Sequence, residues 1–178
     1  MMTQDELKQA VAHAALDYVV DGEIIGVGTG STANFFIDEL GKNRHRIQGA
    51  VASSEATANR LKSHGITVFD LNDLTHLSVY VDGADEITPK LSLLKGRGQD
   101  LVMEKLLATA AKQFVVVADK SKLVSRIGEK FVIPIEVMPN AWQMVKQQLE
   151  KHGGNGDIRL NASQDNVAIS AQGNYILD

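Results

Sequence analysis

The sequence predicts an α/β fold: a doubly wound, Rossmann-like parallel sheet followed by a smaller α+β subdomain. Short apolar runs alternate with amphipathic helical segments over residues 1–130, which is typical of parallel strands covered by helices on both faces. The 178 residues are 44% hydrophobic and 22% charged, a composition that supplies a buried core. From Phe131 the pattern changes to short strands around a single helix, which predicts the second unit.

Helices in the first part are predicted where apolar residues recur every three or four positions, and strands where they run continuously. A first helix opens with a capping box of Thr3 and Glu6 and ends before Asp21. Gly41 and Gly65 are predicted to end the second and third helices. The predicted later helices are 33–40, 55–64 and 101–112, and the predicted strands are 23–27, 50–52, 66–69, 77–81 and 114–118.

The second part is predicted to hold a strand over 131–137, a helix over 140–152 and short strands over 158–160, 166–170 and 175–177. Pro134 suits a strand at a sheet edge, because proline has no N–H for a ladder bond. The predicted division is therefore a Rossmann-like domain, residues 1–130, and an α+β subdomain, residues 131–178. Since the last strand coincides with the end of the sequence, this subdomain is expected to stop early.

Composition excludes several classes of function. There are no cysteines, so thiol catalysis, cysteine–zinc sites and disulfides are excluded. The net charge is −4 and no run of lysine or arginine interrupts it, which argues against a broad nucleic-acid-binding face but leaves room for a local anion pocket. The five histidines show no metal-ligand spacing. With neither a signal peptide nor an apolar stretch long enough for a membrane, we expect a cytoplasmic protein with no nucleic-acid or membrane partner.

The first segment that could carry chemistry is Gly26–Thr32, between a predicted strand and a helix. Its glycines allow an anion to approach the backbone, and the helix start presents free N–H groups. It lacks the last glycine of the dinucleotide fingerprint and the lysine of the Walker A motif. A phosphate or carboxylate site is the functional interpretation, and a tight turn whose Ser31 caps the helix is the alternative.

Three further segments follow along the chain. Asp82–Glu86 carries three carboxylates after a strand, and the alternative is a solvated acidic turn. Lys95–Lys105 places a glycine-rich basic loop before Glu104, and the alternative is a helix capped by Asp100 with Glu104 facing solvent. Lys122 follows a strand and faces either a phosphate or bulk solvent. All four segments gather at one sheet edge, which suits proton transfer on a small phosphorylated, hydroxyl-rich substrate.

These segments resemble the type A ribose-5-phosphate isomerases. The matching stretches keep the family's order and spacing and cover essentially the whole chain: 3–8, 26–32, 81–86, 95–96, 104–105, 118–122, 134–137 and 153–154. The resemblance implies interconversion of ribose 5-phosphate and ribulose 5-phosphate through an enediol(ate), without metal or organic cofactor. It also implies a homodimer or homotetramer.

The resemblance also implies roles for individual residues. Glu104 is the acid/base that moves a proton between C1 and C2, and Lys95 stabilises the developing oxyanion. Asp82 and Asp85 hold sugar hydroxyls and assist ring opening. The implied substrate-binding residues are Lys8, Thr29, Gly30, Ser31, Thr32, Asp82, Gly83, Ala84, Asp85, Lys95, Gly96, Arg97, Gly98 and Lys122.

Two features depart from the family pattern. The family's loop usually has the sequence Lys-Gly-Gly-Gly-Ala-Ala, whereas here Arg97, Gln99 and Asp100 interrupt it, with Met103 before Glu104. Arg97 is expected either to carry strain, if its φ is positive, or to add a cation near the phosphate. Family members also run some tens of residues further, so the sequence is incomplete, or its subdomain is truncated or completed by a partner.

Two other functions stay open at this point. One is a non-catalytic sugar-phosphate-binding protein, a sensor or an inactive homologue; the presence of both Lys95 and Glu104 counts against it, because a sensor needs no proton shuttle. The other is an aminosugar-phosphate deaminase or lactonase of the same superfamily. That chemistry is expected to depend on a histidine near the site, and none of the five lies in a motif loop.

Overall fold

A four-stranded parallel sheet forms the centre of the computed structural model, which describes residues 2–178. Its strand order is β2-β1-β3-β6. The strands are β1 (Ile24–Val27), β2 (Gly49–Ala52), β3 (Leu77–Asp82) and β6 (Ala111–Val116). The chain leaves β1 in one direction to form β2 and then crosses to the other side to form β3. The sheet is therefore doubly wound, as predicted, and its connections reverse between β1 and β3.

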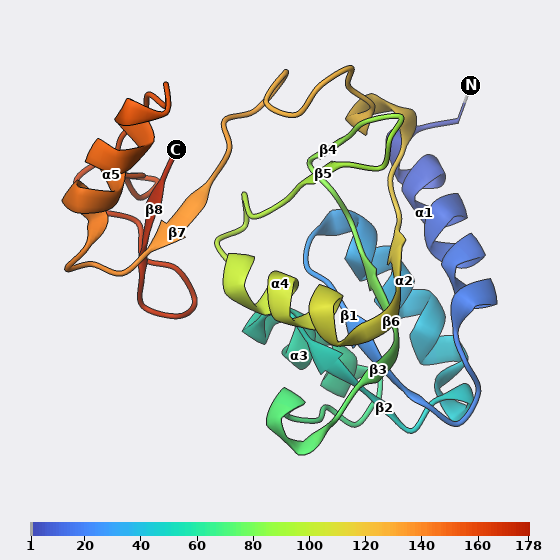
Figure 1. The fold of residues 1–178 in the computed structure, drawn as a ribbon. Coiled ribbons are helices and arrows are strands. Elements are labelled where there is room, and N and C mark those ends of the chain that lie inside the picture. The colour runs from blue at the N-terminus through green and yellow to red at the C-terminus, as the bar shows by residue number, and fades with distance from the viewer. Residues whose placement is uncertain (1) are drawn as a thin grey trace.

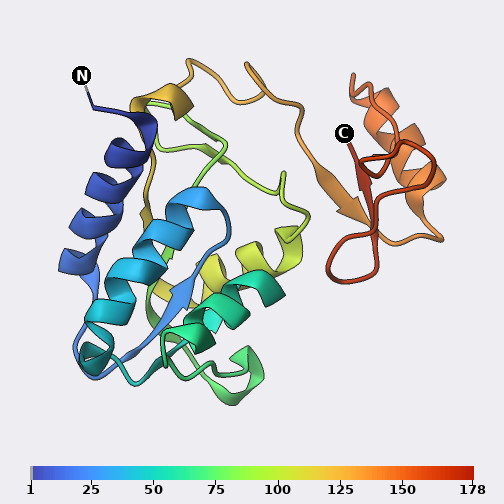
Figure 2. The same ribbon diagram turned by 180° about the vertical axis from the view of Figure 1, so that it is seen from behind.

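Helices cover both faces of this sheet (Figures 1 and 2). They are α1 (Gln4–Ala14), α2 (Ser31–Lys42), α3 (Glu55–Ser63) and α4 (Leu101–Ala110). On one face, Phe36 and Leu40 of α2 pack with Val79 and Val81 of β3. On the other, Leu107 of α4 packs in a second buried cluster with β2 and β3 residues. Within residues 2–178, no helix has the length and apolar character needed to span a membrane.

The remaining elements lie outside the main sheet. A hairpin of β4 (Glu86–Ile87) and β5 (Leu93–Leu94) follows β3. A long segment then leads from β6 to β7 (Ile135–Val137), which pairs antiparallel with β8 (Tyr175–Leu177) beside α5 (Trp142–Lys151). Figure 1 shows this orange and red unit to one side of the sheet. Short 3-10 helices occupy Ala15–Tyr18, Arg44–Arg46, Leu71–Asp73 and Lys120–Lys122.

Gly41 does not end α2, contrary to the sequence prediction. The helix continues to Lys42, and Asn43 is its C-cap. A Cβ atom at Gly41 would overlap the imidazole ring of His64, at the C-terminal end of α3. The glycine therefore serves close packing between two helix segments rather than helix termination.

Several predicted strands are shorter in the structure. The stretch 66–69 forms only an isolated bridge between Ala50 and Val68. The stretches 158–160 and 166–170 are joined by one isolated bridge, Leu160 to Val167, and Ile158 forms another with Leu177. The predicted strand 131–137 is regular only from Ile135, because Pro134 and the residues before it belong to the connecting segment. The predicted helix 101–112 ends at Ala110, and β6 begins directly after it, earlier than predicted.

Candidate active site

The residues singled out in the sequence surround one cavity of about 220 Å³ at the carboxyl edge of the sheet. This edge lies where the connections reverse between β1 and β3, the usual ligand position in open α/β sheets. The cavity is lined by Gln4, Lys8, Thr29, Gly30, Ser31, Thr32, Ala33, Gly83, Ala84, Asp85, Lys95, Gly96, Arg97, Gly98, Glu104 and Lys122. Asp82, the remaining predicted residue, does not line the cavity; it is fully buried and contacts the lining residues Thr29, Gly83 and Lys95.

The turn after β1 brings the chain very close to β3. A Cβ atom at Gly28 would overlap the carboxylate of Asp82, so only glycine fits there. Gly30 has φ +114° and is the N-cap of α2, which has no side-chain cap. The alternative in which Ser31 caps the helix is therefore wrong, and the uncapped N–H groups of the first turn lie at the cavity. The hydroxyl of Thr29 is bonded within the protein, 2.6 Å from Ser53 Oγ.

Asp82 is the centre of a buried hydrogen-bond network. Its Oδ1 accepts from the backbone N–H groups of Thr29 at 3.2 Å and Gly83 at 2.7 Å. Its Oδ2 accepts from the phenol of Tyr80 and lies 2.7 Å from Lys95 Nζ. Burial, assisted by the charge of Asp82, raises the pKa of Tyr80 far above its ordinary value, so Tyr80 stays a neutral donor. Asp82 is fully buried and is held by four donors.

Lys95 joins this network to Glu104. Its ammonium lies 2.7 Å from Asp82 Oδ2 and 3.2 Å from Glu104 Oε1, and it donates to the carbonyl of Gly83 at 2.7 Å. Burial acts to lower the pKa of Lys95, but the two carboxylates outweigh it and raise that pKa above the ordinary value. The ammonium therefore stays charged and in a fixed position at the cavity.

Glu104 lies on the first turns of α4 and is buried, with 9% of its surface exposed. The alternative that places it on the solvent face of the helix is therefore wrong. Burial raises the pKa of Glu104 to about 7, opposed by Lys95 and assisted by Asp82. Its second oxygen, Oε2, is buried without a hydrogen-bond partner among the described residues. A carboxyl group with a free oxygen and a pKa near neutrality suits general acid–base chemistry.

The carboxylates of the acidic turn after β3 have two different roles. Asp85 lines the cavity, and its Oδ2 lies 3.4 Å from the backbone N of Arg97. Glu86 is fully buried and instead accepts backbone N–H groups of Gly128, Lys130 and Phe131 at 2.6–2.8 Å. The segment is thus neither a solvated turn nor a set of three site carboxylates, because Glu86 holds the segment that follows β6.

The loop between Lys95 and α4 carries its positive φ angles at Gly96 (+97°) and Gln99 (+71°), and not at Arg97. The predicted strain at position 97 is therefore absent. The Arg97 guanidinium stacks over the ring of Phe131, 3.9 Å from its centroid. Asp100 occupies the N-cap position of α4, but its side chain forms no cap hydrogen bond, contrary to the alternative interpretation.

Two further cations line the cavity. They are Lys8, on α1, and Lys122, in a 3-10 turn after β6. Lys8 is 3.7 Å from Asp5, and no ion pair to Lys122 is found among the described residues. Residues 2–178 contain no group of three or more His, Asp or Glu side chains that could hold a metal ion. They likewise place no histidine in the cavity lining.

Comparison with known proteins decides the family. Residues 49–178 match the family model of ribose 5-phosphate isomerase A, also called phosphoriboisomerase A, which is well over half of the chain. The chain belongs to the ribose 5-phosphate isomerase A family.

Solved structures of family members have the same fold. Ribose 5-phosphate isomerase A from Neisseria gonorrhoeae is 42% identical, with a TM-score of 0.92 over 100% of this chain and 77% of the relative. The enzyme from Methanocaldococcus jannaschii is 37% identical, with a TM-score of 0.92 over 99% of this chain and 80% of the relative. A D-ribose-5-phosphate isomerase in complex with phospho-erythronic acid is 36% identical, with a TM-score of 0.91 over 99% and 79% of the two chains.

Sequence reasoning on this family member missed four residues at or beside the cavity. Gln4 and Ala33 line it, Tyr80 holds Asp82, and Phe131 supports Arg97. Gln4 lies in the capping-box turn and carried no chemical signal of its own. Tyr80 was findable, because a polar tip two residues before a buried aspartate on a strand points to the same face.

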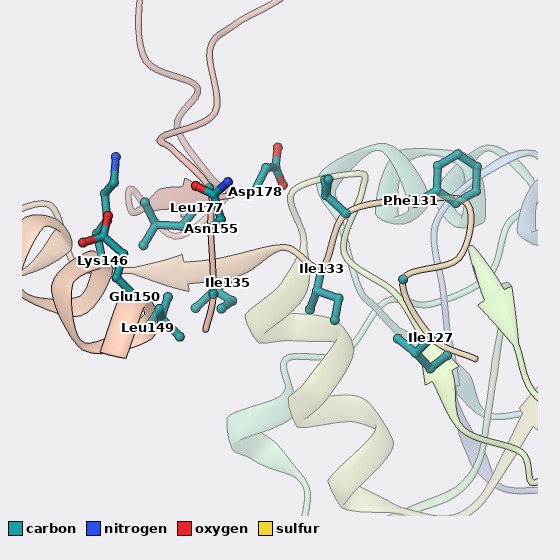
Figure 3. Close-up of a pocket in the computed structure, with 14 residues that line it drawn as sticks. Ile127, Phe131, Ile133, Ile135, Lys146, Leu149, Glu150, Asn155, Leu177 and Asp178 are labelled. Carbon is teal, nitrogen blue, oxygen red and sulfur yellow. The ribbon is translucent and has the colours of Figure 1, made fainter. Parts of the chain in front are cut away.

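A second cavity, of about 430 Å³, lies between segment 127–133 and the β7–β8 unit. Figure 3 shows apolar side chains around it, including Ile133, Ile135, Leu149 and Leu177, with Lys146 and Glu150 nearby. It shares no lining residue with the cavity at the sheet edge. The second cavity therefore contains none of the side chains that the sequence singled out for chemistry.

Proposed function

We propose that this protein interconverts ribose 5-phosphate and ribulose 5-phosphate through an enediol(ate), with Glu104 as the acid/base. The observation that carries the proposal is the pairing of the buried Glu104 with the half-buried Lys95, 3.2 Å apart at a cavity of about 220 Å³. A carboxyl group with a pKa of about 7 beside a fixed cation is what proton abstraction next to a carbonyl requires. Family membership supports the same substrate class.

The proton moves between adjacent carbons of the open-chain sugar. Glu104 removes the proton from C2, and the electrons of that C–H bond form the C1–C2 double bond while negative charge collects on O1. The ammonium of Lys95 stabilises this oxyanion. A proton then passes from O2 to O1, and Glu104 returns its proton to C1, which leaves the ketone at C2. The reverse sequence converts the ketose to the aldose.

Asp82 and Asp85 have different surroundings and therefore different proposed tasks. Asp82 is fully buried, lies outside the cavity lining and is bonded to Lys95, so its first task is to orient that cation. Asp85 lines the open cavity and is free to accept a bond from a sugar hydroxyl. We assign ring opening and hydroxyl recognition to this pair.

The phosphate binds at the other end of the cavity. The uncapped start of α2 supplies backbone N–H groups and the positive end of the helix dipole, and Ser31 and Thr32 add hydroxyl groups. Lys8 and Lys122 supply two cations. One relative was solved with phospho-erythronic acid, a phosphorylated sugar acid, and such a ligand suits a cavity with cations and N–H donors.

Turnover of ribose 5-phosphate by the purified chain in EDTA, beside Glu104→Gln, tests this proposal. We expect activity that resists chelation and falls about 10²–10⁴-fold in the variant, because general acid–base catalysis contributes that much. Binding of phospho-erythronic acid should survive in the variant. An inactive wild-type chain that binds the acid normally would favour the non-catalytic binding protein instead.

Three expectations remain proposals alongside the activity. The division into residues 1–130 and 131–178, assembly as a homodimer or homotetramer, and a cytoplasmic location all rest on the sequence and the family. Sedimentation equilibrium of the purified chain tests the assembly, since a monomer at micromolar concentration would contradict a homodimer or homotetramer.

A further inference from the structure

The loop between Lys95 and Glu104 has little internal support. It contains two residues with positive φ, Gly96 and Gln99, and one backbone bond between them, from Gln99 N to Gly96 O at 3.2 Å. Since Lys95 precedes this loop and Glu104 follows it on the first turns of α4, the distance between the two side chains depends on the loop conformation. A loop with few bonds of its own must be held from outside.

Arg159, in the β7–β8 unit, provides such a hold. Its Nε and Nη2 form a fork with the Asp178 carboxylate at 2.6 Å each, and its Nη1 donates to the carbonyl of Arg97 at 3.1 Å. The Arg159 side chain is 14% exposed. One guanidinium thus joins the β7–β8 unit to the middle of the loop.

The backbone of Arg159 is itself fixed. Its N–H donates to Ile176 at 2.7 Å, and its carbonyl accepts from Ala168 at 2.9 Å. Asp178 is fixed as well, because its backbone exchanges two hydrogen bonds with Asp157, at 2.9 and 3.1 Å. The guanidinium is therefore held in place by two residues, Arg159 and Asp178, whose backbones are both fixed by hydrogen bonds.

Two further contacts from the same part of the chain reach the loop. The Ala171 N–H donates to the carbonyl of Gln99 at 3.2 Å, and the Phe131 ring supports the Arg97 guanidinium at 3.9 Å. Phe131 is tied in turn to Glu86 through its backbone N–H at 2.8 Å. The loop is thus bracketed by segment 131–178 on one side and bonded to Asp85 on the other.

We propose that Arg159 is a positioning residue that holds the loop 96–99 so that Lys95 and Glu104 stay aligned. This rests on the proposed function and gives the β7–β8 unit a part in the reaction. Arg159 does not itself line the cavity and reaches the lining through the carbonyl of Arg97, so it acts on the proposed reacting atoms through the loop. Arginine is required because its planar guanidinium carries donors on three separate nitrogens, whereas a lysine ammonium has all its donors on one atom and cannot span the Asp178 carboxylate and the Arg97 carbonyl in the same geometry.

The test compares Arg159→Met and Arg159→Lys with a matched control, Arg60→Met. Arg60 forms a similar fork with Asp38, at 2.7–3.1 Å, but lies on α3 and outside the cavity lining. We expect Arg159→Met to lower kcat about 10–100-fold with KM changed less than about threefold, because a misplacement near 1 Å costs about that much. Amide hydrogen exchange should accelerate in peptides covering 96–100. Arg60→Met should change neither quantity.

Arg159→Lys separates positioning from folding. It keeps an ion pair with Asp178, so its thermal unfolding should match that of the wild type, yet its kcat should fall nearly as far as in Arg159→Met. Should Arg159→Met fail to fold, the lysine variant decides. The proposal would be overturned if either variant of Arg159 folds, keeps the wild-type kcat and shows unchanged amide hydrogen exchange in peptides covering 96–100. If the wild type itself has no isomerase activity, the proposed function fails, and loop exchange alone decides whether Arg159 holds the loop.

Discussion

At the scale of single residues, the central feature is a carboxylate that is held rather than free. Asp82 receives two backbone N–H groups, the Tyr80 phenol and the Lys95 ammonium, and none of its surface is exposed. A charged group buried this deeply is tolerated only because every donor is in place. This network fixes Lys95 before any substrate arrives, which is the preorganisation that electrostatic catalysis needs.

Tyr80→Phe tests whether the phenol contributes to that alignment. The change removes one donor to Asp82 and keeps the ring that stacks on Phe114, 4.8 Å between centroids. We expect kcat to fall about tenfold, because a hydrogen bond to a charged group is worth about 1.5–3 kcal/mol. Tyr18→Phe is the control, since Tyr18 is 48% exposed and lies outside the cavity lining. Equal kcat in the two variants would count against a positioning role for Tyr80.

The pKa of Glu104 sets the pH dependence. Proton abstraction needs the carboxylate form, and burial raises that pKa to about 7. We therefore expect kcat/KM to fall about tenfold per pH unit below about pH 7 and to level off above it. Titration of Lys95 does not alter kcat/KM in this pH range, because its pKa lies above the ordinary value of 10.5. A profile that is flat down to pH 5 would show that Glu104 is not the essential base.

At the scale of elements, the site depends on the close approach of the turn after β1 to the carboxyl end of β3. The turn after β1 passes over the carboxyl end of β3 with no room for a side chain at Gly28. The same close approach lets the Gly28 N–H donate to the Val81 carbonyl at 2.8 Å. The chemistry is thus set by the sheet itself, which is more rigid than the loops around it.

Gly28→Ala tests this dependence. The added methyl group would displace Asp82, so we expect kcat/KM to fall by at least about 100-fold. Gly22→Ala is the comparison, because Gly22 has φ +77° but nothing within 4 Å of the added atom. That change should cost about 1 kcal/mol of stability through backbone strain and leave kcat/KM intact. Similar losses of activity in both variants would point to general destabilisation instead.

At the scale of the whole molecule, local sequence patterns predicted the sheet and the gathering of the motif segments at its edge. Apolar runs and glycine turns are local signals, and the doubly wound order follows from their alternation. The pattern failed where long-range packing decides. Gly41 has the local pattern of a helix end, but its role is to make room for His64 of a distant segment. Glu86 has the local pattern of a site carboxylate, but it binds the backbone of residues 128–131. The site-to-subdomain contact through Arg159 spans 62 residues and leaves no local trace.

Solvent deuterium tracks the proposed proton transfer most directly. Wild-type protein and Glu104→Gln are incubated with ribose 5-phosphate in D₂O, and C1 of ribulose 5-phosphate and C2 of ribose 5-phosphate are followed by NMR over many turnovers. We expect the wild type to introduce deuterium at both carbons, because the protonated Glu104 carboxyl exchanges with solvent while the enediol(ate) is bound, and we expect the variant to introduce none. Rapid interconversion with the original hydrogen fully retained would contradict transfer through Glu104 and an enediol(ate).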